Sequence, residues 1–128
     1  MREIKFRAWD NFFKQMYYFD FENNIEVRSG HLWIVHEEGA ISSKSPSIKI
    51  MQYTELKDKN GTEIYEGDIV KVKDIYSNIE YVGFVDFADA SFIIKTSYMS
   101  AYRWMDYEVE ILGNVYENQE LLEEEEKC

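Results

Sequence analysis

The stretch Gln52–Lys73, QYTELKDKNGTEIYEGDIVKVK, decides the fold of this chain because it combines turn residues with strand-forming residues. Asn60-Gly61 supplies a turn that needs a positive φ angle, and Glu66-Gly67-Asp68 supplies a second tight reversal. The second turn leads directly into Ile69-Val70-Lys71-Val72, a short apolar run typical of a β-strand. The stretch therefore predicts antiparallel strands joined by tight turns.

Strand patterns continue on the C-terminal side of this stretch. Residues 80–87 form a nearly continuous apolar run, which predicts a strand buried on both faces. Ala88-Asp89-Ala90 makes a tight connection to residues 92–96, and residues 108–114 begin with alternating acidic and apolar side chains, as a last strand. A bend at Gly83 would let one strand curl around its neighbour. This series of short strands and tight turns predicts a small SH3-like barrel.

The N-terminal side also predicts strands. Residues 4–9 alternate between apolar and mostly charged side chains, which is the two-residue period of a half-buried strand. Asp10-Asn11 offers a turn, and the aromatic residues at 17, 19 and 21 share one face of a second strand, so the two segments are expected to pair as a hairpin. Residues 25–28 predict a further short strand, and residues 32–36 either a strand or a short helix.

A change of composition marks the best candidate for a domain boundary. Glu37–Ser47, EEGAISSKSPS, gathers small and polar residues with the only Pro, as in an exposed linker or long loop. We therefore predict an N-terminal β-hairpin region with its linker over 1–47, the barrel over 48–116, and an acidic C-terminal helix or tail over 117–128. In that last segment Asn118 is expected to cap a short helix. The predicted fold class is all-β.

Length and composition are those of a small soluble protein. The chain has 128 residues, of which 45% are hydrophobic and 16% aromatic, which is too much apolar material for a disordered chain. No apolar run approaches the roughly 20 residues needed to span a bilayer, and the N-terminus lacks the apolar stretch of a signal peptide. The single cysteine, Cys128, cannot form an intrachain disulfide. These features predict a cytoplasmic protein with no membrane contact.

The negative charge of the chain is concentrated at its C-terminal end. The formal net charge is −11; from Asp106 onward nine acids and one Lys give −8, whereas sixteen acids and thirteen bases in residues 1–105 give −3. A short acidic run of this kind is most often a solvated tail.

Few residues could carry chemistry. His31 and His36 are the only histidines, and their spacing keeps the two rings from converging, whether the segment is a strand or a helix. The sequence has no zinc-type Cys/His spacing, phosphate loop or nucleophile elbow. Asp86 lies in an apolar strand near Asp89 and could act as an acid or base, but it is expected to point outward. We therefore predict no catalytic, cofactor or metal site, and a protein that is not an enzyme.

Aromatic side chains offer the best candidate surface for binding. Small barrels can stack single-stranded bases on such rings, but a body at −3 and a tail at −8 would repel a phosphate backbone, so the charge weighs against nucleic acid. Ser97–Asp106, SYMSAYRWMD, has the composition of a protein interface, unless its rings fold over the open end of the barrel. The aromatic residues considered are Tyr76, Tyr81, Tyr98, Tyr102, Trp104 and Tyr107, with Arg103 among them.

The N-terminal hairpin has more aromatic surface than two strands can bury alone, so it is expected to pack on the barrel or on another subunit. A homo-oligomer follows from that excess. The predicted protein-contact residues are Trp9, Phe12, Phe13, Tyr98, Tyr102, Arg103 and Trp104.

Three motifs along the chain carry a family resemblance: MREIKFRAWD at the start, the stretch Gln52–Lys73, and GNVYENQELL near the end. With them the chain resembles the YopX family of phage and prophage proteins over nearly its whole length. The resemblance implies an SH3-like barrel in the C-terminal part, a host bacterial cell as the location, and no particular activity. The chain departs from the family pattern at Glu55, where Gly is expected, and at Gln119, where Pro is usual.

The resulting hypothesis is a phage or prophage accessory protein that binds a host or phage protein, or assembles with itself, without catalysis. The alternative is an acidic nucleic-acid mimic that inhibits a DNA-binding protein of the host, with the Glu-rich end as the imitation of a phosphate backbone.

Overall fold

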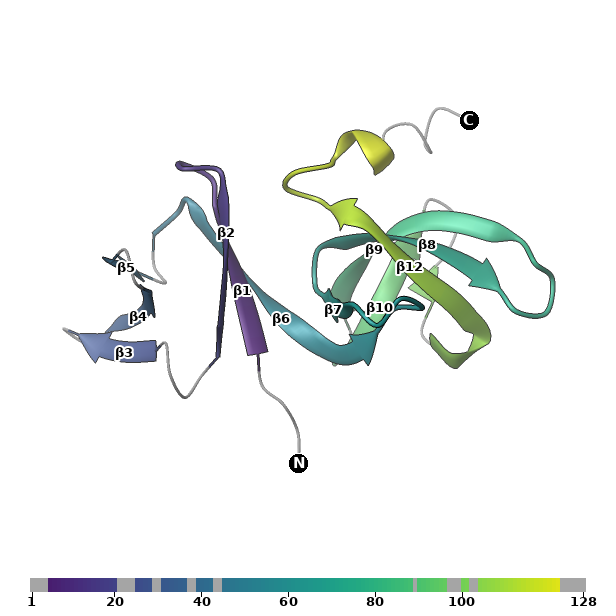
Figure 1. The fold of residues 1–128 in the computed structure, drawn as a ribbon, viewed down its shortest axis with the longest axis horizontal. Coiled ribbons are helices and arrows are strands. Elements are labelled where there is room, and N and C mark those ends of the chain that lie inside the picture. Colours follow the sequence, from purple (N-terminus) through teal and green to yellow (C-terminus); the bar gives the residue numbers. More distant parts are fainter. Residues whose placement is uncertain are drawn as a thin grey trace. The chain divides into compact units, whose positions relative to one another are not determined.

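The computed structural model describes residues 5–20, 25–28, 31–36, 39–42, 45–88, 90–96, 100–101 and 104–122. These residues are nearly all in antiparallel β-sheets, one of them a half-barrel, and the predicted all-β class is confirmed (Figure 1). The chain forms two compact units, Met1–Tyr53 (unit 1) and Thr54–Cys128 (unit 2). They divide inside strand β6 (Ile48–Lys57), beyond the boundary that the sequence suggested after Ser47.

The first sheet of unit 1 contains the predicted hairpin. Strand β1 (Lys5–Asp10) lies between β2 (Gln15–Asp20) and the start of β6, and it pairs antiparallel with both. The Phe6 and Phe19 rings stack across the hairpin, 5.6 Å apart between centroids, beside a small buried cluster of Ala8, Phe19 and Ile48. Strand β1 was expected to be half-buried, with alternate residues exposed, but every residue from position 7 to position 10 is buried.

Three further strands of unit 1 form a separate antiparallel sheet: β3 (Ile25–Arg28), β4 (His31–His36) and β5 (Gly39–Ser42). Residues 32–36, for which the sequence allowed either a strand or a short helix, are therefore a strand. The prediction of a loop over Glu37–Ser47 was wrong for its middle, because β5 pairs with β4 over four positions. The small and polar residues of β5 do not predict a strand by themselves. The strand forms because pairing with β4 supplies its backbone hydrogen bonds.

Unit 2 contains the half-barrel. Its five-stranded sheet has the order β11-β10-β9-β8-β12, with every neighbouring pair antiparallel. The barrel predicted for the C-terminal part is present as this half-barrel. The strands of the unit are β7 (Glu63–Tyr65), β8 (Asp68–Asp74), β9 (Glu80–Ala88), β10 (Ser91–Thr96), β11 (Ser100–Ala101) and β12 (Tyr107–Asn114). Its buried core consists of Ile64, Val70, Val72, Val85, Ile94, Ala101 and Val109.

Both predicted turns of the central stretch are present. Gly61 has φ +84° and Gly67 has φ +83°, so each occupies the left-handed region that favours glycine. The buried carboxylate of Asp68 accepts a hydrogen bond from the Tyr65 backbone N–H at 2.8 Å, which closes the second turn. Asp68 is therefore a structural turn residue.

Strand β9 is bent and is not buried on both faces as expected. A Cβ atom at Gly83 would meet the backbone carbonyl of Lys95 on β10 and would lie 2.9 Å from Thr96 Cγ2, so β10 crosses close to this residue. Only Gly83 and Val85 of β9 are buried, and the Phe87 side chain is 50% exposed. The prediction was wrong because most side chains of the run are only half-buried, and Phe87 is exposed although it shares a face of the strand with Gly83 and Val85.

The C-terminal segment turns sharply before a short helix over residues 120–122. The Asn118 side chain does not cap this helix as predicted. Its Oδ1 accepts a hydrogen bond from the Asn114 N–H at 3.1 Å, while its backbone carbonyl accepts from the Leu121 N–H at 3.0 Å. Asn118 therefore fixes the chain reversal after β12.

Candidate protein-contact surface

One edge of the half-barrel is closed by the carboxylate of Asp58. The side chain is buried, and its Oδ1 accepts hydrogen bonds from the backbone N–H groups of Asn60 at 2.9 Å and Thr62 at 3.0 Å. Its Oδ2 accepts from the N–H of Ile111 on β12 at 3.0 Å. The Lys59 N–H also donates to the Val109 carbonyl, at 2.9 Å. The turn after β6 thus supplies hydrogen-bond partners for the backbone groups on the outer edge of β12, which would otherwise be open to pairing with another strand.

The same hydrogen bonds decide the charge state of Asp58. Burial by itself would raise the pKa of this carboxyl, but the N–H groups of Ile111, Thr62 and Asn60 outweigh it and leave the pKa below its ordinary value. Asp58 is therefore a stable anion that holds the edge together.

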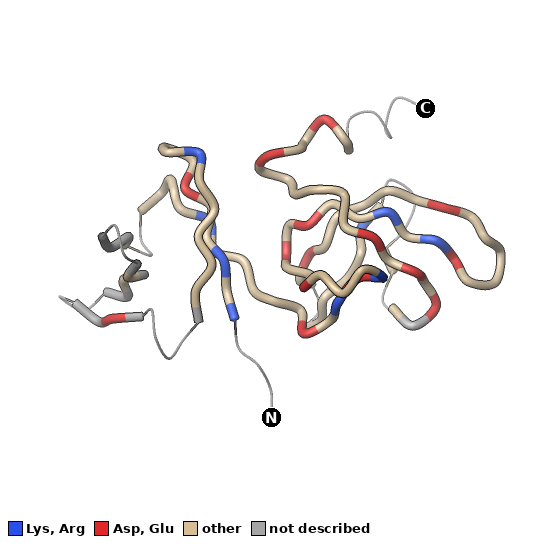
Figure 2. Tube along the Cα trace, in the orientation of Figure 1, with Lys and Arg blue, Asp and Glu red and all other residues tan. Residues whose placement is uncertain are grey.

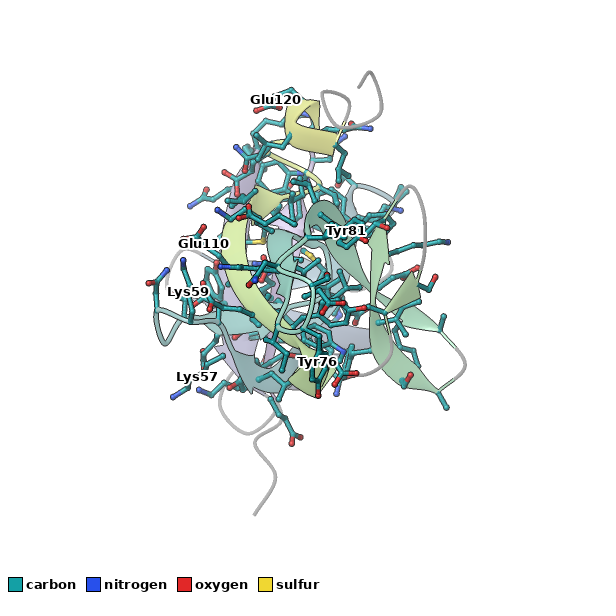
Figure 3. The ribbon with its side chains drawn as sticks, turned by 90° about the vertical axis from the view of Figure 1, so that its right-hand side faces the viewer. Lys57, Lys59, Tyr76, Tyr81, Glu110 and Glu120 are labelled. Atoms are coloured by element: carbon teal, nitrogen blue, oxygen red, sulfur yellow. The ribbon has the colours of Figure 1, made fainter. Side chains whose placement is uncertain are left out.

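A network of ion pairs covers the face beside this edge. Lys59 Nζ lies 3.5 Å from Glu110 Oε2 and 3.7 Å from Glu108 Oε1, and Figure 3 shows Lys59 and Glu110 on the same side of the unit. Lys71 Nζ lies 3.5 Å from Glu110 Oε1 and 3.7 Å from Glu80 Oε2. Such partly exposed pairs contribute little to stability, but they offset the negative charge of this face.

Large apolar side chains are exposed at the β8–β9 tip, the loop of residues 75–79 between strands β8 and β9. Tyr76 is 79% exposed, and Ile75 and Ile79 are 51% and 52% exposed. Large apolar side chains exposed together on so short a segment mark an interaction site more often than scattered ones do.

This tip is held in one conformation by hydrogen bonds. Asp74 Oδ1 accepts from the N–H groups of Tyr76 at 2.8 Å and Ser77 at 3.1 Å, and the Asp74 carbonyl accepts from Asn78 at 2.8 Å. The Ile75 N–H donates to the Asp106 carbonyl at 3.0 Å, which ties the loop to the chain just before β12. Because the loop is already ordered, its apolar side chains can bind at a low entropic cost.

Two acidic residues lie next to the β8–β9 tip. Asp74 precedes it, and Asp106 is bonded to it through its backbone carbonyl, whereas the carboxylate of Glu80, which follows the tip, pairs with Lys71. Their effect is seen on the nearby Tyr107 phenol: burial raises its pKa, and the Asp74 and Asp106 charges raise it further. The apolar tip therefore has an acidic rim.

A second exposed apolar group lies in unit 1, at the β1–β2 tip, the turn of residues 11–14. Phe12 and Phe13 are 77% and 69% exposed, and their rings meet edge to face with centroids 4.8 Å apart. Asp10 Oδ1 accepts from both backbone N–H groups, at 2.9 and 3.1 Å, and so fixes the turn. Lys14 has φ 56°, and its Nζ donates to Asn11 Oδ1 at 2.8 Å.

The other predicted contact residues have different positions. Trp9 is only 4% exposed, so it is buried and offers no contact surface. Trp104 packs against the core of unit 2, and its indole N–H donates to the Phe92 carbonyl at 2.9 Å. Tyr98, Tyr102 and Arg103 lie outside the described residues.

Sequence reasoning missed Ile75 and Ile79, although it singled out Tyr76. The segment Asp74–Glu80, DIYSNIE, carries the signal that could have revealed them. Its Ser-Asn pair is a turn, and large apolar residues on both sides of a turn have no core to enter.

The two histidines considered for chemistry do not come together, and Asp89, considered with Asp86, lies outside the described residues. His31 and His36 begin and end β4, about 17 Å apart along an extended strand. Asp86 Oδ1 accepts from the N–H of the next residue, Phe87, at 2.9 Å. Within the described ranges, no three His, Cys, Asp or Glu side chains are grouped so that they could hold a metal ion. In the same part of the chain, no helix is long and apolar enough to cross a membrane.

The two units differ completely in charge. Unit 1 has seven acidic and seven basic residues and is neutral, whereas unit 2 has eighteen acids against seven bases and carries the whole net charge of −11. Figure 2 shows the acidic positions concentrated in unit 2.

The fold and its surfaces define a small all-β protein with a closed half-barrel edge and exposed apolar loop tips. The family model for YopX protein matches residues 5–123, and the chain belongs to the YopX family. The resemblance noted in the sequence is thereby confirmed.

Relatives in two bacteria are similar to this chain in sequence and in fold. The SPbeta prophage-derived uncharacterized protein YopX of Bacillus subtilis (strain 168) is 28% identical over 132 residues, which cover 92% of this chain and 95% of that protein. The X-ray structure of protein yopX from Bacillus subtilis aligns with a TM-score of 0.64 at 26% identity, over 92% of this chain and 97% of that one. The crystal structure of protein EF1440 from Enterococcus faecalis aligns with a TM-score of 0.60 at 31% identity, over 95% and 99% of the two chains.

Proposed function

We propose that this chain is a prophage accessory protein that acts as a non-catalytic protein-binding module, with the β8–β9 tip as its contact surface. The observation that carries the proposal is the ordered exposure of Ile75, Tyr76 and Ile79 on a loop fixed by hydrogen bonds. Tyr is enriched at the centre of protein interfaces, where its ring is buried and its hydroxyl finds a partner.

The acidic rim specifies the chemistry of the partner. A segment that places an apolar side chain against Tyr76 and a Lys or Arg near Asp74 would match both features of the tip. Full burial of each large apolar side chain contributes about 1.5–3 kcal/mol, so this tip supports a contact of modest strength. A protein of the host cell or of the phage is the proposed partner, and homo-oligomerisation is the form of binding considered below.

Site-specific crosslinking tests the proposal. A photo-reactive phenylalanine analogue replaces Tyr76 in one variant and Glu120 in a control, because Figure 3 shows Glu120 at the top of the view and Tyr76 well below it. Both positions are exposed. In nuclease-treated bacterial lysate, protein adducts are expected from position 76 and not from position 120. Equal yields from both positions, or none from either, would contradict the assignment of this surface.

The acidic mimic is a second proposal, supported by the location of the entire net charge in unit 2. A mimic needs free carboxylates, however, and the ion pairs of Lys59 and Lys71 offset those of Glu80, Glu108 and Glu110. Removal of residues 117–128 separates the two proposals. Loss of a DNA-binding partner after this truncation would support mimicry, whereas retention of the partner would support the tip.

A further inference from the structure

The two exposed tips are both apolar and carry opposite charges beside their apolar side chains. The β8–β9 tip presents aliphatic and aromatic side chains inside an acidic rim, and the β1–β2 tip presents two Phe rings beside a lysine. We infer that the β1–β2 tip of a second copy of this chain is the partner that binds the β8–β9 tip. This inference rests on the proposed function of the β8–β9 tip and names its occupant.

The apolar parts of the two tips match. Phe12 and Phe13 form one compact edge-to-face pair, so they present a single wide apolar knob. Ile75 and Ile79 lie on either side of Tyr76 in the loop, and all are at least half exposed. Contact between the two groups would remove from water the aromatic side chains that are most exposed among the described residues of each unit.

The charges of the two tips also match, and both are available to a partner. The Lys14 ammonium bonds to the amide oxygen of Asn11, and in the described part of the chain it has no carboxylate partner. The Asp74 carboxylate accepts backbone N–H groups, and among the same residues it has no cationic partner. Lys14 could therefore approach Asp74 or the ring face of Tyr76, and both interactions favour this pairing over contact between identical tips.

The contact has a defined symmetry. Since it joins two different surfaces, a single contact leaves one copy with an unused β8–β9 tip and the other with an unused β1–β2 tip, and further copies can add head to tail. A contact between two loop tips is small, so its dissociation constant is expected to be on the order of 100 μM.

Sedimentation of the full chain tests the inference, with two variants that each disable one tip: Phe12→Ser/Phe13→Ser and Ile75→Ser/Tyr76→Ser. The parent protein is expected to associate between roughly 20 and 500 μM, a range that brackets this affinity. Each variant alone should associate at least about tenfold more weakly. An equal mixture of the two variants should form a heterodimer and nothing larger, because only one productive contact remains between them.

The charge of the contact is tested separately with Lys14→Glu, which leaves both apolar groups intact. This variant is expected to weaken self-association severalfold at low salt, and high salt should narrow its difference from the parent. An unchanged association constant would remove the electrostatic part of the inference and overturn the pairing as stated.

The remaining outcomes separate this inference from the proposed function. A strictly monomeric parent at several hundred micromolar, or failure of the mixture to form a heterodimer, overturns the pairing of the two tips. If only Ile75→Ser/Tyr76→Ser loses association, the β8–β9 tip still binds protein but the β1–β2 tip is not its partner. The crosslinking result at position 76 stands or falls independently of both outcomes.

Discussion

Two regions of unit 2 differ in the kind of side chain that they bury and expose. At the β12 edge a charged group, Asp58, is buried and fully engaged by backbone N–H groups. At the β8–β9 tip large apolar groups are exposed, although hydrogen bonds fix the loop that carries them. The difference indicates that the edge maintains the fold and that the tip is kept for a partner.

The largest loss of stability is expected from Asp58→Ala. The variant leaves the N–H groups of Asn60, Thr62 and Ile111 without their acceptor, which should cost about 2–4 kcal/mol of unfolding free energy. Hydrogen exchange in urea, read on peptides from β8 and β12, measures unit 2 separately from unit 1. Asp86→Ala is the matched control, since its carboxylate accepts only from the adjacent Phe87 N–H, and a similar loss there would contradict the role given to Asp58.

Gly83→Ala is expected to cost about 1–3 kcal/mol, because its Cβ would meet the Lys95 backbone carbonyl on β10. Gly61→Ala is the control for this space requirement. A Cβ there would have no heavy atom within 4 Å, so only the cost of a positive φ remains, about 1 kcal/mol. Equal losses in the two variants, measured by the same exchange experiment, would show that the close approach of β10 is not the cause.

Acid should weaken unit 2 through Asp58. A carboxyl whose pKa is lowered by folding stabilises the fold above its ordinary value of 3.8 and loses that contribution progressively as the pH falls through its lower folded value. The expected loss therefore lies below about pH 4, and it should be smaller in Asp58→Ala, which lacks the group. Urea midpoints of both proteins between pH 7 and pH 2.5 measure the effect; identical pH profiles would contradict it.

The smallest change expected is a gain from Glu55→Gly. Glu55 has φ 73°, which costs a residue with a Cβ more than it costs glycine, so the variant should be more stable by about 0.5–1 kcal/mol. Glu55→Ala keeps the Cβ and removes the carboxylate. If both variants gained equally in urea unfolding, the charge of Glu55 and not its backbone would be the cause.

Much of the fold could be predicted from the sequence, because the deciding patterns are local. The turns at Gly61 and Gly67 followed from glycine and its neighbours, and the hairpin of β1 and β2 followed from alternation around Asp10. Even the unusual backbone of Glu55 was indicated, since it stands where the family has glycine.

Errors occurred where a partner outside the segment decides its structure. Strand β5 depends on pairing with β4, and the position of Asn118 depends on the N–H of Asn114. The exposure of Phe87, near the end of β9, depends on how far the core extends along that strand. None of these partners can be identified from the composition of the segment itself.

The candidate surface was predicted only in part, for a similar reason. An aromatic residue at an expected turn is readily assigned to the surface, as for Phe12 and Phe13. Trp9 and Trp104 were also predicted as contact residues, but tertiary packing buries Trp9 and places Trp104 against the core. The apolar residues beside Tyr76 were overlooked because isoleucine in a strand-rich chain is ordinarily assigned to the core.

The unfolding free energy of Ile75→Ser/Tyr76→Ser, measured beside its self-association, tests the central claim most directly. The variant should keep the stability of unit 2 within about 0.5 kcal/mol, because its side chains are exposed, while association falls at least about tenfold. A loss of stability comparable to that of Asp58→Ala, with association unchanged, would show that the β8–β9 tip serves the fold and not a partner.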